Sequence, residues 1–121
     1  QLVTVTVTGA ATPDDARRAA KAIANSPLVK TAIHGGDPNW GRVLAAIGTT
    51  DAAFDPGAVD VVMNGVAVCR NGAIGEPRQA VDLSGRQVTV TIDLRAGDAV
   101  ARLLTTDLTH DYVHENSAYS T

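Results

Sequence analysis

Residues 34–42 read HGGDPNWGR and contain three glycines, a proline and the only tryptophan of the 121-residue chain. The apolar run at 43–47 follows directly. Pro38 has a fixed φ and biases the preceding residue toward an extended conformation. Asn39 is a residue type that often caps helices. The stretch therefore predicts a polar loop, defined by its backbone, that leads into a short helix starting near Trp40.

The strands are predicted from alternation of apolar and polar residues. Residues 2–8 alternate valines with threonines, and residues 86–94 alternate in the same way. Residues 59–63 and 66–70 flank an Asn-Gly pair, which is typical of a type I′ hairpin. Residues 99–106 fit either a further strand or a short helix. Because they follow 86–94 after a short turn, we favour a strand that forms a second hairpin with 86–94.

Helices are predicted from their start signals. Thr12 and Pro13 are a cap and a first helical residue. Residues 28–33 fit either a strand or a helix, and the Ser-Pro pair before them favours the helix. Residues 78–83 are at best a short helix, and 108–116 are predicted as a C-terminal helix. The fold class predicted is α+β, a mainly antiparallel sheet with helices packed on one face.

Composition excludes several classes of protein. The net charge is -3 and there is no basic block, so we expect no nucleic-acid partner. No apolar run is long enough to span a membrane. The single Cys69 excludes an intrachain disulfide and fits a cytoplasmic location. We expect Cys69 in the core, and Lys30 on the surface with Arg17 and Arg18.

The chain alone lacks a convincing catalytic set. His34, His110 and His114 have no adjacent nucleophile in the sequence. The last two are four residues apart on the predicted final helix, a spacing that can bind a metal. Without a third ligand, a surface pair is the better interpretation, so no metal site is predicted.

Two long strings resemble one known family. Residues 30–42, KTAIHGGDPNWGR, closely resemble the signature of the ornithine acetyltransferases, the glutamate N-acetyltransferases of the acetyl cycle. Residues 107–121, DLTHDYVHENSAYST, look like the C-terminus of that family, and residues 2–9 also match it. The resemblance spans essentially the whole chain and implies part of a layered α/β sandwich of that type.

The resemblance implies an acyltransferase with a ping-pong mechanism. Members cut themselves before a threonine, which becomes the nucleophile at the start of the β chain. It takes acetyl from N2-acetyl-L-ornithine and passes it to L-glutamate, and some members also use acetyl-CoA. No cofactor is required. The catalytic threonine and the oxyanion-hole residues of the family match nothing in these 121 residues, so no catalytic residue is assigned.

The same resemblance implies partners. Residues 1–121 are expected to be one unit from the C-terminal part of the β chain of a heteromeric enzyme. The α chain and the remaining β-chain segment would be its partners, in an (αβ)2 or higher oligomer. A sheet cut at Gln1 is expected to leave an edge strand that needs a partner.

The resemblance also implies site residues. Asn116 and Thr121 correspond to the family's substrate-binding asparagine and terminal threonine. An amide and a hydroxyl suit the carboxylates and amine of small amino-acid substrates. The loop is expected to be active-site scaffold, through Gly35, Gly36, Asp37, Asn39, Trp40 and Arg42.

Three alternatives remain. The first is an aminopeptidase or amidohydrolase on the same self-cleaving scaffold, which would transfer to water. The second is a paralogue with the same half-reactions in a secondary-metabolite pathway. The third is a noncatalytic interface module, which predicts no amino-acid binding.

Overall fold

The computed structural model describes residues 1–106, and they form a mixed sheet covered by helices. The strands and helices, in chain order, are β1 (Leu2–Ala10), α1 (Pro13–Ala24), α2 (Pro27–His34), α3 (Trp40–Gly48), β2 (Asp60–Met63), β3 (Val66–Arg70), β4 (Ala73–Ile74), the 3-10 turn η1 (Arg78–Ala80), β5 (Gln87–Asp93) and β6 (Ala99–Thr106). The α+β class predicted from the sequence is therefore confirmed.

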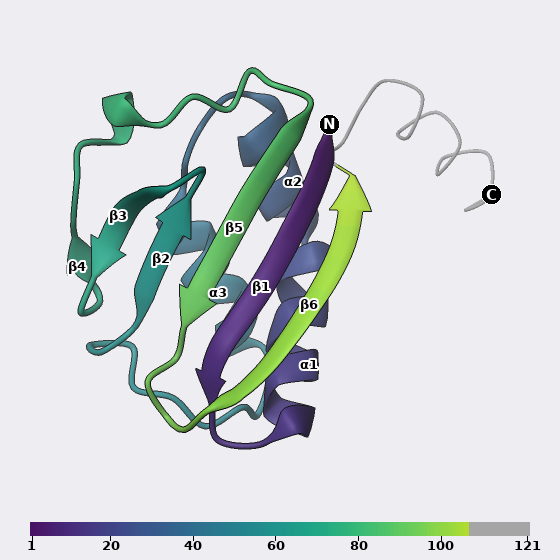
Figure 1. The fold of residues 1–121 in the computed structure, drawn as a ribbon, viewed down its shortest axis with the longest axis vertical. Helices are drawn as coiled ribbons and strands as arrows, with labels where there is room; N and C mark the ends of the chain where they lie inside the picture. The colour runs from purple at the N-terminus through teal and green to yellow at the C-terminus, as the bar shows by residue number, and fades with distance from the viewer. Residues whose placement is uncertain (107–121) are drawn as a thin grey trace, which may run out of the picture.

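The sheet has the strand order β4-β3-β2-β5-β1-β6. β1 is parallel to β5, and the other neighbours are antiparallel. The three helices lie together behind the sheet in Figure 1. This matches the expectation of helices on one face.

The core lies between the sheet and the helices. Val3, Val5 and Val7 of β1 are buried, whereas the threonines between them are only half-buried on the other face. The valines of β1 pair in register with apolar residues of β5, including Val5 with Val90. The alanines of α1 that face them are fully buried, so the helix packs close to the sheet.

The predicted hairpin between residues 86–94 and 99–106 is wrong, because β1 lies between β5 and β6. The connection passes over the end of β1, where the Ala96 amide donates to the Gly9 carbonyl at 2.7 Å. Arg95 has φ +50 there, and a Cβ at Gly97 would collide with the Ala10 carbonyl oxygen. The turn is therefore built to cross a strand, and local pattern does not reveal this.

β1 lies inside the sheet and is not an edge strand. It is hydrogen-bonded to β5 on one side and β6 on the other. In the part of the chain described, the edges of the sheet are β4 and β6.

Several local predictions are confirmed. The Thr12 side chain accepts from the Asp15 amide at 3.0 Å and caps α1. Residues 28–33 lie in α2. Asn64 and Gly65 both have positive φ, as a type I′ turn requires. Of residues 78–83, only the first three are helical, in η1.

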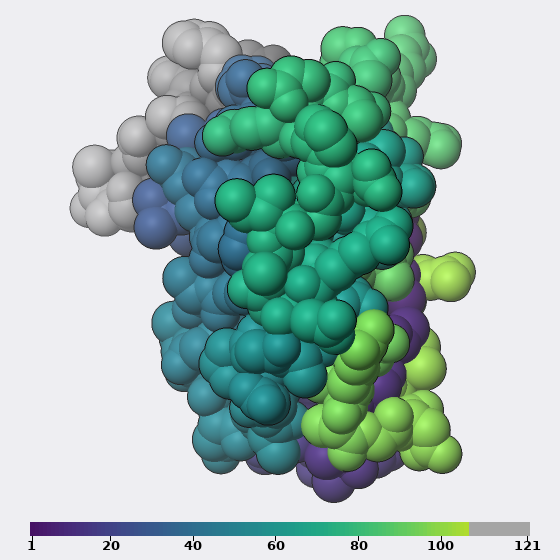
Figure 2. Space-filling view, turned by 90° about the vertical axis from the view of Figure 1, so that its left-hand side faces the viewer, coloured from purple at the N-terminus to yellow at the C-terminus, as the bar shows by residue number. Residues whose placement is uncertain are grey.

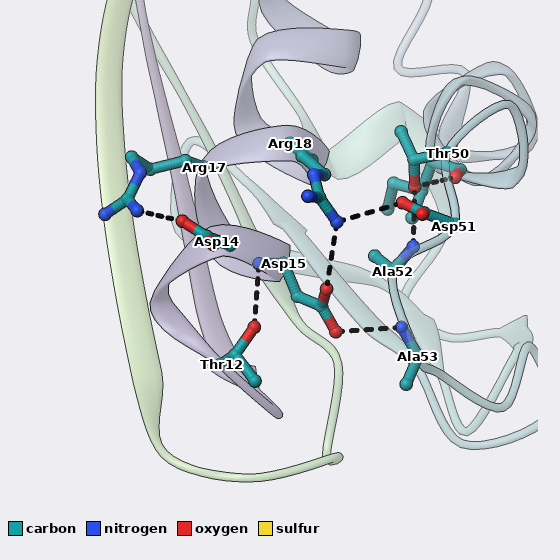
Figure 3. A network of polar contacts seen from close by, with 10 residues as sticks. Thr12, Asp14, Asp15, Arg17, Arg18, Thr50, Asp51, Ala52 and Ala53 are labelled. Carbon is teal, nitrogen blue, oxygen red and sulfur yellow. Dashed lines mark hydrogen bonds and ion pairs between the residues drawn. The ribbon is translucent and has the colours of Figure 1, made fainter.

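The N-terminus of α1 is tied to the segment that follows α3 (Figure 3). The Asp15 carboxylate accepts from the Ala53 amide at 3.0 Å, and the Arg18 guanidinium donates to Asp51 at 3.1 Å. Both arginines of α1 are exposed, as predicted, and Arg17 pairs with Asp14. No helix within residues 1–106 has the length and apolar character needed to cross a membrane.

Candidate functional site: the loop between α2 and α3

α2 ends in a closed backbone turn at the two glycines. The Gly36 amide donates to the Ile33 carbonyl at 3.0 Å, and the Asp37 amide donates to the Ala32 carbonyl at 2.8 Å. These two bonds form a Schellman motif, which requires a left-handed residue just after the helix. Gly36 supplies it with φ +73. The position of Asp37 is therefore set by the end of α2.

α3 starts at the cap predicted from the sequence. The Asn39 Oδ1 atom accepts from the Arg42 amide at 3.1 Å. Its Nδ2 group donates to Asp37 Oδ2 at 3.2 Å, so one side chain bonds both to the loop and to the helix. The Arg42 guanidinium donates to the Leu28 carbonyl at 2.9 Å in the first turn of α2. The loop thus holds α2 and α3 in a defined relation.

A distant arginine completes this network. The Arg78 guanidinium of η1 donates to Asp37 Oδ1 and forms an ion pair with it. Asp37 therefore uses one oxygen for Asn39 and the other for Arg78. Sequence reasoning missed Arg78, because nothing near it in the chain indicates a contact with the loop.

Trp40 lies beside a pocket of about 460 Å³ between the loop and the β4–η1 segment. Val68 and Ile74 contribute apolar walls, and Arg78 and Gln79 contribute polar ones. Trp40 is partly buried and packs against the core. Figure 2 faces this edge of the molecule and shows the green segment lying against the blue loop and helices. The pocket is mixed in polarity and open to solvent.

A second pocket of about 570 Å³ lies at the end of α2, and His34 and Gly36 line it together with Gln1, Asp82 and Ser84. The Ser84 hydroxyl and amide donate to Asp82 at 2.5 and 2.9 Å. Both bonds hold the pKa of Asp82 below its usual value, and the hydroxyl bond has the larger effect. Asp82 therefore keeps its negative charge to a lower pH than an ordinary aspartate does.

Lys30 is buried, with 7% of its surface exposed, so the prediction of a surface lysine is wrong. It lies on the same side of α2 as Val29 and Ile33, which are also buried. A lysine can lie along an apolar surface through its long methylene stem. The helix that leads into the loop therefore has a cation on its inner side.

Cys69 is a core residue, as predicted. It is fully buried in β3, and its Sγ lies 3.5 Å from the Val59 carbonyl oxygen. Burial raises the pKa of the thiol, which keeps it protonated and poorly nucleophilic. Within residues 1–106, no group of three His, Cys, Asp or Glu side chains is placed to hold a metal ion.

The whole sequence can be compared with known protein families. The sequence profile of the ArgJ family matches residues 1–121, which is the whole chain. The chain belongs to the ArgJ family.

Three ArgJ relatives show how close the match is. Each is called arginine biosynthesis bifunctional protein ArgJ, and each aligns with 98% of this chain. The identity is 60% for Thermobifida fusca, 58% for Streptomyces coelicolor and 57% for Mycobacterium tuberculosis H37Rv. The chain spans only 29–31% of the length of these relatives.

A solved ArgJ structure shows the same fold. The chain is similar to the crystal structure of arginine biosynthesis bifunctional protein ArgJ from Bacillus halodurans, with a TM-score of 0.89 and 33% identity. The match covers 98% of this chain and 58% of that one. This match confirms the fold that the resemblance to ornithine acetyltransferases implied.

The predicted ArgJ site residues divide into two groups. Gly35, Gly36, Asp37, Asn39, Trp40 and Arg42 lie together in the loop and its flanking helix turns. Asp37, Asn39 and Arg42 are hydrogen-bonded to one another and to neighbouring parts of the chain, and the role of the loop as active-site scaffold stays a prediction. Asn116 and Thr121, like His110, His114 and the predicted helix 108–116, lie outside the described residues.

Proposed function

We propose that this chain is part of an acetyltransferase that moves acetyl from N2-acetyl-L-ornithine to L-glutamate in arginine biosynthesis. The observation that carries the proposal is the match of the whole chain to the ArgJ family. Relatives of 57–60% identity are named as bifunctional proteins of arginine biosynthesis. The one cysteine, Cys69, is buried, and its raised pKa makes it a poor nucleophile, so we do not assign it to the reaction.

The reaction we propose has two acetyl transfers. A threonine of the longer protein attacks the acetyl carbonyl of N2-acetylornithine, and ornithine leaves as the amine. Glutamate then attacks the acetyl-threonine ester, which releases N-acetylglutamate and restores the hydroxyl. A covalent intermediate divides one difficult transfer into two easier ones. Acetyl-CoA as a second donor would enter at the first step.

Within this enzyme, Asn116 and Thr121 would bind the amino-acid substrate. They follow β6, whose last described residue, Thr106, pairs with Leu2 of β1. The neighbouring Gln1 lines the pocket at the end of α2 with His34 and Gly36. Thr106, after which the segment with Asn116 and Thr121 begins, therefore lies at the same end of the sheet as this pocket.

The loop would support the site rather than react. Its polar side chains are used in bonds to the protein: Asn39 to Arg42 and Asp37, and Asp37 to Arg78. A group held in this way keeps neighbouring backbone in place during a reaction that depends on orientation.

Completing the enzyme would require the α chain and the rest of the β chain, in an (αβ)2 or higher assembly.

The proposal is tested with the intact protein that contains this chain. N-acetylglutamate and ornithine are measured after mixing N2-acetylornithine with glutamate, and free acetate is measured without glutamate. We expect transfer that depends on glutamate. Equal release of acetate with and without glutamate would instead show a hydrolase. Deletion of the gene in its source organism separates the two roles, because an arginine requirement would show the arginine pathway and growth without arginine would show a secondary-metabolite role.

Variants test the substrate contacts. Asn116→Ala and deletion of Thr121 should each lower kcat/KM about 10- to 100-fold, as expected for lost hydrogen bonds to charged substrates. Asn25→Ala is the matched control, because Asn25 is exposed at the end of α1 and its amide caps the helix through the backbone. If both site variants retained the activity of the control, the chain would be better described as an interface module.

A further inference from the structure

β6 presents a long open edge. Its eight residues pair only with β1 among the strands of residues 1–106, and the strand closes one side of the sheet in Figure 1. Proteins protect such edges with proline, lysine, bulges or very short strands, because unpaired amides and carbonyls attract further strands. The sequence of β6, AVARLLTT, contains no proline, lysine or glycine. Its one charged residue is Arg102, and the register irregularity in its pairing with β1, between Val7 and Ala10, lies at the first residues of β6. By contrast, β4 at the opposite edge has two residues.

Two large apolar side chains are exposed on the open face of β6. Val100 is 60% exposed and Leu104 is 66% exposed. Arg102 lies between them and is also exposed, and no hydrogen bond or ion pair of its side chain is recorded within residues 1–106. Arg102 is opposite Thr6 of β1, which is a neutral neighbour. The edge therefore combines apolar contact area with one unpaired cation.

We propose that the outer edge of β6 receives a β-strand from the same longer protein, formed by polypeptide outside these 121 residues. This strand would extend the sheet and place an acceptor side chain next to Arg102. The chain covers 31% of the Thermobifida relative and 58% of the solved Bacillus chain, so polypeptide is available. The inference concerns assembly and does not rest on the proposed reaction.

A second copy of this chain is the other possible occupant, and charge argues against it. Suppose that two copies paired antiparallel through β6 about a two-fold axis. The side chains on the open face of one copy would then lie opposite those on the open face of the other copy. Full overlap then places Arg102 directly opposite, or diagonal to, Arg102 of the other copy. Like charges at those positions destabilise a sheet. A strand of different sequence avoids this repulsion.

Hydrogen exchange of the intact protein, with all its polypeptides, tests the proposal. A paired β6 should show amide protection within about tenfold of that of β5, which has neighbours on both sides. The reference for an open edge is the exchange rate of an unstructured peptide with the sequence of β6. If the β6 amides that do not pair with β1 exchanged at that rate, the edge would be open and the proposal would be overturned.

A crosslink separates the two occupants. The double variant Val100→Cys, Leu104→Cys is made in the intact protein, with Arg102 kept, and treated with a mild oxidant. Pairing of two copies about Arg102 would bring position 100 of one copy opposite position 104 of the other, and a disulfide between those positions of two copies would overturn the proposal. We expect no such product. Arg86→Cys is the control, because Arg86 is also exposed and lies just before β5, away from the edge.

Discussion

Arg78 and Asp37 form an ion pair across 41 positions of the sequence, and it joins η1 to the loop between α2 and α3. The same carboxylate accepts from Asn39, which caps α3. The loop is therefore held at three points, which are the end of α2, the start of α3 and η1. This relation suggests how the loop can act as a scaffold.

Breaking this pair should loosen the loop without unfolding the protein. Arg78→Ala should lower the free energy of unfolding by only about 0–1 kcal/mol, because the pair is largely exposed. Asp37→Ala should cost more, since Asn39 loses a partner as well. Urea unfolding of the two single variants and the double variant measures the coupling. Arg70→Ala, which breaks the exposed pair with Glu76, is the control.

Gly36→Ala should destabilise the protein through its backbone alone. A Cβ at this position would meet no atom within 4 Å, but φ is +73. An L-residue in that region costs roughly 1–2 kcal/mol. Gly48→Ala is the matched control, because space is also open there and the residue is helical. It should be neutral or stabilising by about 0.5–1 kcal/mol. Equal effects in denaturant unfolding would refute a left-handed requirement at Gly36.

Cys69 should make stability fall at high pH. Burial raises the pKa of its thiol, so the folded state holds the proton more tightly than the unfolded state. Its contribution is complete below the unfolded pKa of about 8.5 and is lost as pH rises above it. Unfolding free energies at neutral and alkaline pH should differ less in Cys69→Val than in the unchanged protein. An unaltered difference would contradict a buried, protonated thiol.

Asp82 should titrate below an ordinary aspartate because of Ser84. The hydroxyl and amide of Ser84 stabilise the carboxylate and lower its pKa. The resulting stability is present above the unfolded pKa of about 3.9 and is lost as pH falls through the folded value. In an NMR titration, Ser84→Ala should raise the pKa of Asp82 by removing the hydroxyl bond. A pKa that did not move would assign the shift to another cause.

Sequence patterns predicted the local structure well and the long-range pairing poorly. The caps at Thr12 and Asn39 and the turn at Asn64-Gly65 depend on neighbouring residues, so their signals are in the sequence. The placement of β1 between β5 and β6 depends on a turn that passes over Gly9. A short turn between two strands is more often a hairpin, and this produced the error.

The site shows the same division. The loop motif was recognisable because its glycines, proline and asparagine have local backbone roles. The partner Arg78 and the burial of Lys30 depend on tertiary packing. An isolated arginine or lysine is usually a surface residue, so residue type alone predicts the wrong environment for Lys30.

The most direct test is the mass of each polypeptide in the intact protein, with peptide mapping of any added acetyl group, after mixing with N2-acetylornithine alone. Our account predicts one added acetyl group on a polypeptide that begins with threonine, none on residues 1–121, and loss of that group when glutamate is added. Acetylation within residues 1–121, or transfer to glutamate with no acetylated intermediate on any chain, would contradict it.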